Sequence, residues 1–188
     1  MSLSPFSSLS PLVLATCGTP EAIAERLPGP AAELAGRLGW SLQTLDAEPD
    51  PQRLQSLQDR AVASAAAGGS LALLPVDPGL WIPAQGTWAA ALGAWRLPAL
   101  LLLPAAELRR GSPAALVALL RQEGVPLVGV IQLWGDWAAE ERRRDGRPWI
   151  GCWPEHGLDA AASEDGAEQA EATLRCLRRA CQGLAGGQ

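Results

Sequence analysis

The strongest constraint on the fold is a series of short, continuously apolar segments separated by stretches that carry helix signals. The apolar segments that read as strands cover residues 11–16, 70–76, 97–103, 126–133 and 149–153, and residues 40–45 form a further candidate strand. A strand exposed on one face alternates apolar and polar residues, whereas a strand covered on both faces is apolar throughout. The pattern therefore predicts an α/β protein, a three-layer sandwich with a mostly parallel central sheet.

Capping residues mark where helices begin and end between these strands. The predicted helices begin after Thr19-Pro20, Asp50-Pro51, Thr87, Ser112-Pro113 and Ser163 or Glu164. Pro28-Gly29-Pro30 interrupts the first helix, and a second piece runs to about Leu38, where Gly39 stops it. Residues 138–146 are charged and are expected to form a solvated loop. No repeat or linker is visible, so we expect a single α/β domain over residues 1–188, with the serine-rich residues 1–10 flexible.

The chain contains no lysine, because all fifteen positive charges are arginine. Neither a Schiff-base lysine nor a phosphate-binding lysine is therefore available. The net charge of −5 argues against nucleic-acid binding, which requires a basic face. The longest apolar run, residues 97–106, is too short to span a bilayer and contains two prolines. These features predict a cytoplasmic protein without membrane partners.

The four cysteines, Cys17, Cys152, Cys176 and Cys181, form no CxxC motif, and the chain has a single histidine. That combination gives no zinc-ligand pattern. We expect buried free thiols in a reducing compartment.

Several motifs between Leu71 and Pro154 occur in a recognisable order. An apolar strand leads into Leu74-Pro75-Val76-Asp77-Pro78-Gly79, Leu97-Pro98 opens the next strand, and Ile150-Gly151-Cys152-Trp153-Pro154 closes the series. This order resembles dethiobiotin synthetase, a P-loop NTPase family, over less than half of the chain. The resemblance implies a P-loop NTPase-like fold; a flavodoxin-like or Rossmann-like doubly wound sheet is the alternative.

The chemical residues of that family are mostly missing. Its phosphate-binding loop has the form Gly-x-x-x-x-x-Gly-Lys-Thr, whereas this chain offers Ala15-Thr16-Cys17-Gly18-Thr19-Pro20-Glu21. The family's magnesium-binding glutamate falls on Pro75, and its base-reading asparagine falls near Gln132 or Leu133. The resemblance thus implies a degenerate member with no supported nucleotide or magnesium cofactor and no catalytic residues.

Candidate ligand-binding residues remain, each with a simpler structural interpretation. Gly18 and Thr19 at a helix start predict anion binding through free N–H groups, or merely a helix cap. Asp77 is a candidate metal ligand or a turn residue. Arg109, with Arg96 as a second choice, is a candidate for bidentate anion recognition in place of lysine.

Two further groups have the same ambiguity. His156 beside Glu155 forms either an acid/base pair or a surface loop. Arg142-Arg143-Arg144 forms either an anion clamp or part of the solvated loop.

Tryptophan is unusually frequent, with eight residues against one phenylalanine and no tyrosine. Trp81 is a candidate ligand-binding residue, and Trp88, Trp134 and Trp137 are candidate interface residues. The sequence favours a non-catalytic protein that acts in binding or assembly through a tryptophan-rich surface, as a homodimer or with another protein. The alternative is an ATP- or anion-dependent enzyme or ligand binder of the same fold that uses arginine instead of the P-loop lysine.

Overall fold

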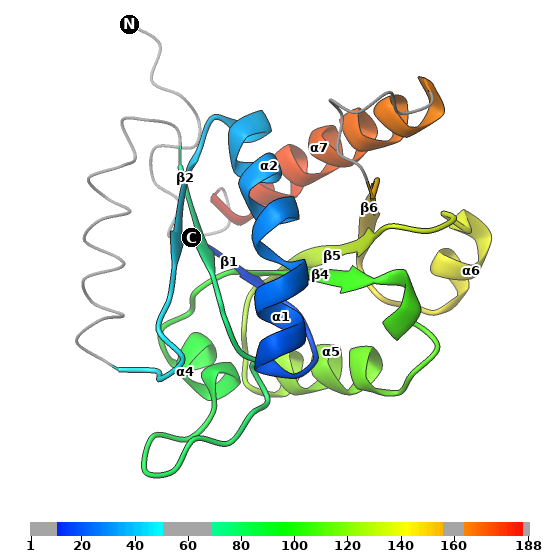
Figure 1. Ribbon diagram of the computed structural model, residues 1–188. Coiled ribbons are helices and arrows are strands. Elements are labelled where there is room, and N and C mark those ends of the chain that lie inside the picture. The colour runs from blue at the N-terminus through cyan, green and yellow to red at the C-terminus, as the bar shows by residue number, and fades with distance from the viewer. Residues whose placement is uncertain (1–10, 51–68, 156–163, 186–188) are drawn as a thin grey trace, which may run out of the picture.

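The computed structural model describes residues 11–50, 69–155 and 164–185, in which six strands form one sheet (Figure 1). The strands are β1 (Leu12–Ala15), β2 (Ser41–Thr44), β3 (Ser70–Leu73), β4 (Ala99–Pro104), β5 (Leu127–Leu133) and β6 (Trp149–Trp153). Their order across the sheet is β2-β3-β1-β4-β5-β6, and every neighbouring pair is parallel. The predicted α/β fold with a parallel sheet is confirmed.

The strand order distinguishes this sheet from two common doubly wound arrangements. In this chain β3 lies directly between β1 and β2. The Rossmann order is 3-2-1-4-5-6, and the flavodoxin order is 2-1-3-4-5. The observed order matches neither of them.

Helices cover both faces of the sheet. They are α1 (Pro20–Arg26), α2 (Pro28–Leu38), α4 (Trp88–Ala94), α5 (Ser112–Gln122), α6 (Ala139–Arg144) and α7 (Glu164–Ala185), with a 3₁₀ turn at Ala105–Glu107. Buried residues of α1, α2 and α7 pack against one face, and those of α4 and α5 pack against the other. Among the described residues, no helix combines the length and the apolar character that a membrane span requires.

Alternate residues of the central strands β1, β3 and β4 supply the two layers of the core. Leu12 and Leu14 of β1 face the layer of α1, α2 and α7, whereas Val13 and Ala15 face the layer of α4 and α5. All four are buried, which explains why the strand reads as a continuous apolar run.

Local capping follows the sequence signals in two cases and departs from them in a third. Thr19 and Thr87 cap α1 and α4, because their hydroxyl oxygens accept hydrogen bonds from Ala22 N at 3.4 Å and Ala90 N at 3.1 Å. Ser112 is not a cap: it is the first residue of α5, and Gly111 precedes it without a side-chain bond.

Other predictions concern segments outside the described residues. These are the flexibility of residues 1–10, the helix after Asp50-Pro51, and the role of His156. The start of α7 at Glu164 agrees with the predicted opening at Ser163 or Glu164.

A close approach of α7 to β6 depends on a glycine. The buried Thr173 hydroxyl accepts a hydrogen bond from Cys152 N at 3.2 Å and lies 3.0 Å from Cys152 O. A Cβ atom on the neighbouring Gly151 would overlap this hydroxyl. The glycine therefore allows the helix to satisfy backbone groups of the strand.

Replacing Gly151 with alanine is expected to lower the free energy of unfolding by about 1 to 3 kcal/mol, because the added methyl group overpacks this contact. The measurement is urea denaturation followed by circular dichroism. Gly36→Ala, on α2, is the control, because nothing lies within 4 Å of a Cβ there. It is expected to stabilise by about 0.5 to 1 kcal/mol. Equal effects of the two changes would contradict the packing argument.

Candidate functional site

A crevice lies at the carboxyl ends of the central strands. The helices that follow β1 cover one face of the sheet, whereas the helices that follow its neighbours β3 and β4 cover the other. Ligands of open parallel sheets bind where the connections diverge in this way. The crevice has a volume of about 420 Å³ and is lined by Thr16, Cys17, Gly18, Thr19, Ala22, Ile23, Arg26, Leu27, Asp77, Pro104, Glu107, Arg110 and Ser112.

Asp77 connects two of the loops around this crevice. Its Oδ2 accepts a hydrogen bond from Gly18 N at 3.1 Å, and its Oδ1 accepts one from Gly79 N at 2.8 Å. The carboxylate therefore lies where an external anion would meet the Gly18 N–H group. Asp77 acts as a turn residue and links the loop after β1 to the loop after β3.

A second carboxylate lies at the start of α1. Hydrogen bonds from the backbone N–H of Glu21 and from the Thr19 side chain lower the pKa of Glu21. The chain itself thus places a negative charge at the start of α1, where it interacts favourably with the positive end of the helix dipole. Gly18 and Thr19, predicted as an anion site, form a helix start in which Thr19 is a cap and the Gly18 N–H group is already bonded.

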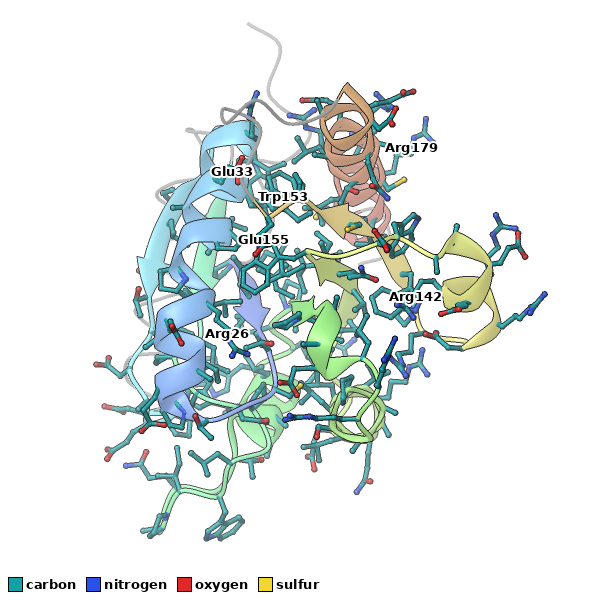
Figure 2. All side chains as sticks on the ribbon, turned by 45° about the vertical axis from the view of Figure 1, so that its right-hand side comes forward. Arg26, Glu33, Arg142, Trp153, Glu155 and Arg179 are labelled. Carbon is teal, nitrogen blue, oxygen red and sulfur yellow. The ribbon has the colours of Figure 1, made fainter. Side chains whose placement is uncertain are left out.

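Two arginines line the crevice, but they are Arg26 and Arg110 and not the predicted candidates. Arg26 Nη1 and Arg110 Nη1 lie 3.9 and 3.1 Å from the two carboxylate oxygens of Glu107. Figure 2 shows Arg26 on the side of α1 that faces the rest of the molecule. The predicted Arg109 and its alternative Arg96 are exposed and contribute nothing to the crevice lining.

The crevice residues that sequence reasoning missed are Thr16, Arg26, Glu107 and Arg110. Thr16, Glu107 and Arg110 follow the apolar runs of β1 and β4, which is the one signal that could have located them. No local pattern marks Arg26, because it depends on the way α1 packs across the strand ends.

Thr16 and Cys17 form the part of the crevice nearest to β1. The Thr16 hydroxyl is buried and has no hydrogen-bond partner among the described residues. Burial and the nearby carboxylates of Asp77 and Glu107 raise the pKa of the Cys17 thiol to about 11. Cys17 therefore stays protonated near neutral pH and is unsuited to nucleophilic chemistry.

Metal binding gains no support from the arrangement of acidic groups. Within the ranges that the structure describes, no three His, Cys, Asp or Glu side chains gather as a metal site would require. Asp77, the predicted metal candidate, uses both oxygens to accept backbone hydrogen bonds.

The tryptophans are mostly part of the packed structure. Trp88, predicted at an interface, is only 2% exposed, and its indole N–H donates to Ala47 O at 2.8 Å. Trp134 is half-buried against the core, and Trp137 packs edge-on against Trp149 with ring centroids 5.9 Å apart. Trp88 is thus a core residue, and the other two predicted interface positions are largely covered by their own chain.

Part of the predicted solvated loop is instead α6, and one of its arginines is half-buried. Arg142 Nε donates to the buried Gln132 Oε1 at 3.1 Å, and its guanidinium lies 5.2 Å from the Trp149 ring centroid. Gln132 Nε2 in turn donates to Trp134 O at 2.8 Å. In Figure 2 Arg142 points from α6 toward the sheet. Gln132, the position nearest to the family's base-reading residue, therefore holds a loop in place.

A further buried polar contact lies between β6 and α2. Trp153 is a core residue, and its indole N–H donates to Glu33 Oε2 at 2.9 Å. Both side chains are labelled in Figure 2, where they lie next to each other. The indole N–H group therefore has a hydrogen-bond acceptor within the chain, and the buried Trp153 ring is not available to a ligand.

Trp81 differs from the other seven tryptophans. It is 70% exposed, and Leu80 beside it is 45% exposed; they are the exposed large apolar side chains of the described residues. Both lie in the loop between β3 and α4, which extends below α4 in Figure 1. We call residues 79–86 the Trp81 loop.

Backbone hydrogen bonds hold the Trp81 loop in one shape. Leu80 N donates to Asp77 O at 2.9 Å, and Ile82 N and Gly86 N exchange bonds with each other's carbonyl oxygens at 2.8 and 3.0 Å. Gln85 Nε2 also donates to Glu48 Oε2 at 3.0 Å. The exposed indole is therefore presented by an ordered loop whose first residues are hydrogen-bonded to Asp77.

Comparison of the chain with known protein families and with characterised proteins gives no match in either case.

Replacing Asp77 with alanine is expected to lower the free energy of unfolding by about 1 to 3 kcal/mol, because Gly18 N and Gly79 N both lose their acceptor. Asp77→Asn is the matched control. It keeps one carbonyl oxygen and is expected to lose less stability than the alanine variant. Thermal and urea denaturation measure both effects, and an unchanged stability of the alanine variant would show that the two loops do not depend on this carboxylate.

Thiol labelling is expected to separate the cysteines by burial. Cys176 is exposed, whereas Cys17, Cys152 and Cys181 are buried, and burial raises the pKa of each buried thiol to about 11. Limited iodoacetamide treatment of the native protein at mildly alkaline pH is expected to modify Cys176 first, as measured by peptide mass spectrometry. Labelling in urea, where all four become accessible, is the control. Early modification of Cys17 in the native protein would contradict the burial of the crevice thiol.

Proposed function

We propose that this chain is a non-catalytic protein of the dethiobiotin-synthetase-like P-loop fold that acts in assembly, and that it forms a homodimer through a surface centred on the Trp81 loop. The observation that carries the proposal is the exposed Trp81–Leu80 pair on an ordered loop. Exposed tryptophan is typical of the centres of protein interfaces, because it buries a large area with little loss of conformational freedom.

The strand order supports the resemblance at the level of the fold. Because β3 lies beside β1, the loop after β1 and the loop after β3 meet at one edge of the sheet. These are the positions that the resemblance assigns to the phosphate-binding loop and to the magnesium carboxylate. The Gly18–Asp77 hydrogen bond joins them directly.

The same two loops support a non-catalytic role. There is no lysine to bind phosphate, the Gly18 N–H group is bonded to Asp77, and Glu21 adds a second carboxylate at the helix start. A polyphosphate approaching this point meets negative charge and already occupied N–H groups. This electrostatic arrangement favours a binding role for the protein over catalysis of phosphoryl transfer.

The dimer surface must extend beyond the two exposed side chains. A stable interface buries about 1,200 to 2,000 Å² in total, whereas one tryptophan contributes about 150 to 250 Å². Trp81 is therefore the expected energetic centre of a larger contact, with the more polar loop residues around it forming the rim.

Sedimentation velocity over a wide concentration range tests the dimer. The wild-type chain is expected to sediment as a dimer at high concentration, and Trp81→Ser is expected to weaken self-association by about thirtyfold, because a hot-spot side chain contributes about 2 kcal/mol or more. Pro83→Ser, an exposed change in the same loop, is the matched control and is expected to leave association nearly unchanged.

Three results would each overturn a part of the proposal. A wild-type chain that remains monomeric at every concentration would remove the homodimer, and a Trp81→Ser variant that associates like the wild type would remove the Trp81 loop as its interface. ATP hydrolysis by the pure protein that is lost in Asp77→Asn would remove the non-catalytic assignment.

A further inference from the structure

The crevice contains two cations and one nearby carboxylate at its outer side. Arg26 and Arg110 approach Glu107 from α1 and from the segment after β4. Glu107 is only 16% exposed, whereas the arginine side chains are 43% and 69% exposed. One carboxylate cannot satisfy two guanidinium groups, each of which carries five N–H donors. The pair therefore retains both positive charge and hydrogen-bonding capacity toward the crevice.

The crevice lining also carries a negative charge. The Asp77 carboxylate lies there and is bonded to Gly18 N and Gly79 N. A second negative charge on a ligand would be repelled by Asp77, while an uncharged group would not. The lining therefore favours a ligand with a single negative charge, held at the two arginines.

Apolar side chains form a further part of the lining. Ile23 and Leu27, one turn apart at the end of α1, and Pro104, at the end of β4, line the crevice and are buried. The Thr16 hydroxyl, buried without a hydrogen-bond partner, lies in the same lining. A volume of about 420 Å³ suits a small organic molecule and falls within the usual range for ligand pockets, about 300 to 1,000 Å³.

We propose that the crevice binds a small monocarboxylate. Its carboxylate lies between Arg26 and Arg110, so that two guanidinium groups and two carboxylates, one of them Glu107, alternate with no net charge. Its uncharged chain lies against Ile23 and Leu27, and a hydroxyl group at its far end gives Thr16 the hydrogen bond that the chain itself does not supply. The site lies apart from the Trp81–Leu80 pair and is independent of self-association.

Titration of the full chain with hexanoate, followed by ligand-observed nuclear magnetic resonance, tests the charge recognition. Arg26→Gln and Arg110→Gln are each expected to weaken hexanoate binding by about tenfold, because each removes a charge-assisted hydrogen bond. Arg109→Gln is the matched control, because Arg109 is adjacent in sequence, exposed and outside the crevice lining. Hexanamide, which has the same shape without the charge, is expected not to bind.

Comparison of 6-hydroxyhexanoate with hexanoate tests the role of Thr16. The wild-type chain is expected to bind the hydroxylated acid more tightly, and Thr16→Val is expected to abolish the difference. This variant keeps the shape of the side chain and removes a hydroxyl that has no partner, so it is expected to fold normally.

Several outcomes would overturn the proposal. These are no hexanoate binding to the wild-type chain, equal binding of hexanamide, unchanged binding in both Arg26→Gln and Arg110→Gln, and stronger binding of inorganic phosphate than of hexanoate. Equal preference for the hydroxylated acid in Thr16→Val and in the wild type would overturn the assignment of the far end. Sedimentation of the same variants separates these results from the dimer, since the arginine and threonine changes are expected to leave self-association unchanged.

Discussion

The hydrogen bonds of the Asp77 carboxylate connect the parts of the molecule on which the rest of the site depends. One oxygen accepts from the loop after β1, and the other accepts from the first turn of the loop after β3. The strand order makes this possible, because β1 and β3 are direct neighbours and their carboxyl ends lie together. A single side chain thereby fixes the inner wall of the crevice and the starting point of the Trp81 loop.

The loop after β1 lacks a lysine, and its Gly18 N–H group is bonded to a carboxylate of the chain itself. In a phosphate-binding loop, backbone N–H groups and a lysine surround an external anion. In this chain an internal carboxylate meets the Gly18 N–H group, and Glu21 lies at the start of the following helix. The positive charge of the crevice comes from Arg26 and Arg110, which lie beside Glu107. Arginine side chains outside the loop after β1 therefore supply the positive charge of this crevice.

The sequence predicts what is determined by neighbouring residues. The buried strands and the caps at Thr19 and Thr87 were predictable, because an apolar run and a hydroxyl before a helix act locally. The sequence could not show that Trp81 is exposed and Trp88 buried, because the two lie close together in the chain. Only the packing of α4 on the sheet buries Trp88. Arg26 and Arg110 were missed for the same reason: they meet at Glu107 only when the chain is folded.

The distribution of the tryptophans also determines the optical properties of the protein. With no tyrosine in the chain, its intrinsic emission arises almost wholly from indole groups. Seven of the eight are buried or half-buried, and Trp81 alone is largely surrounded by solvent. A collisional quencher such as iodide, which does not enter a protein interior, reaches this ring far more readily than the others. The protein therefore carries its own fluorescent reporter on the Trp81 loop, and no extrinsic dye is needed to follow the solvent exposure of that loop.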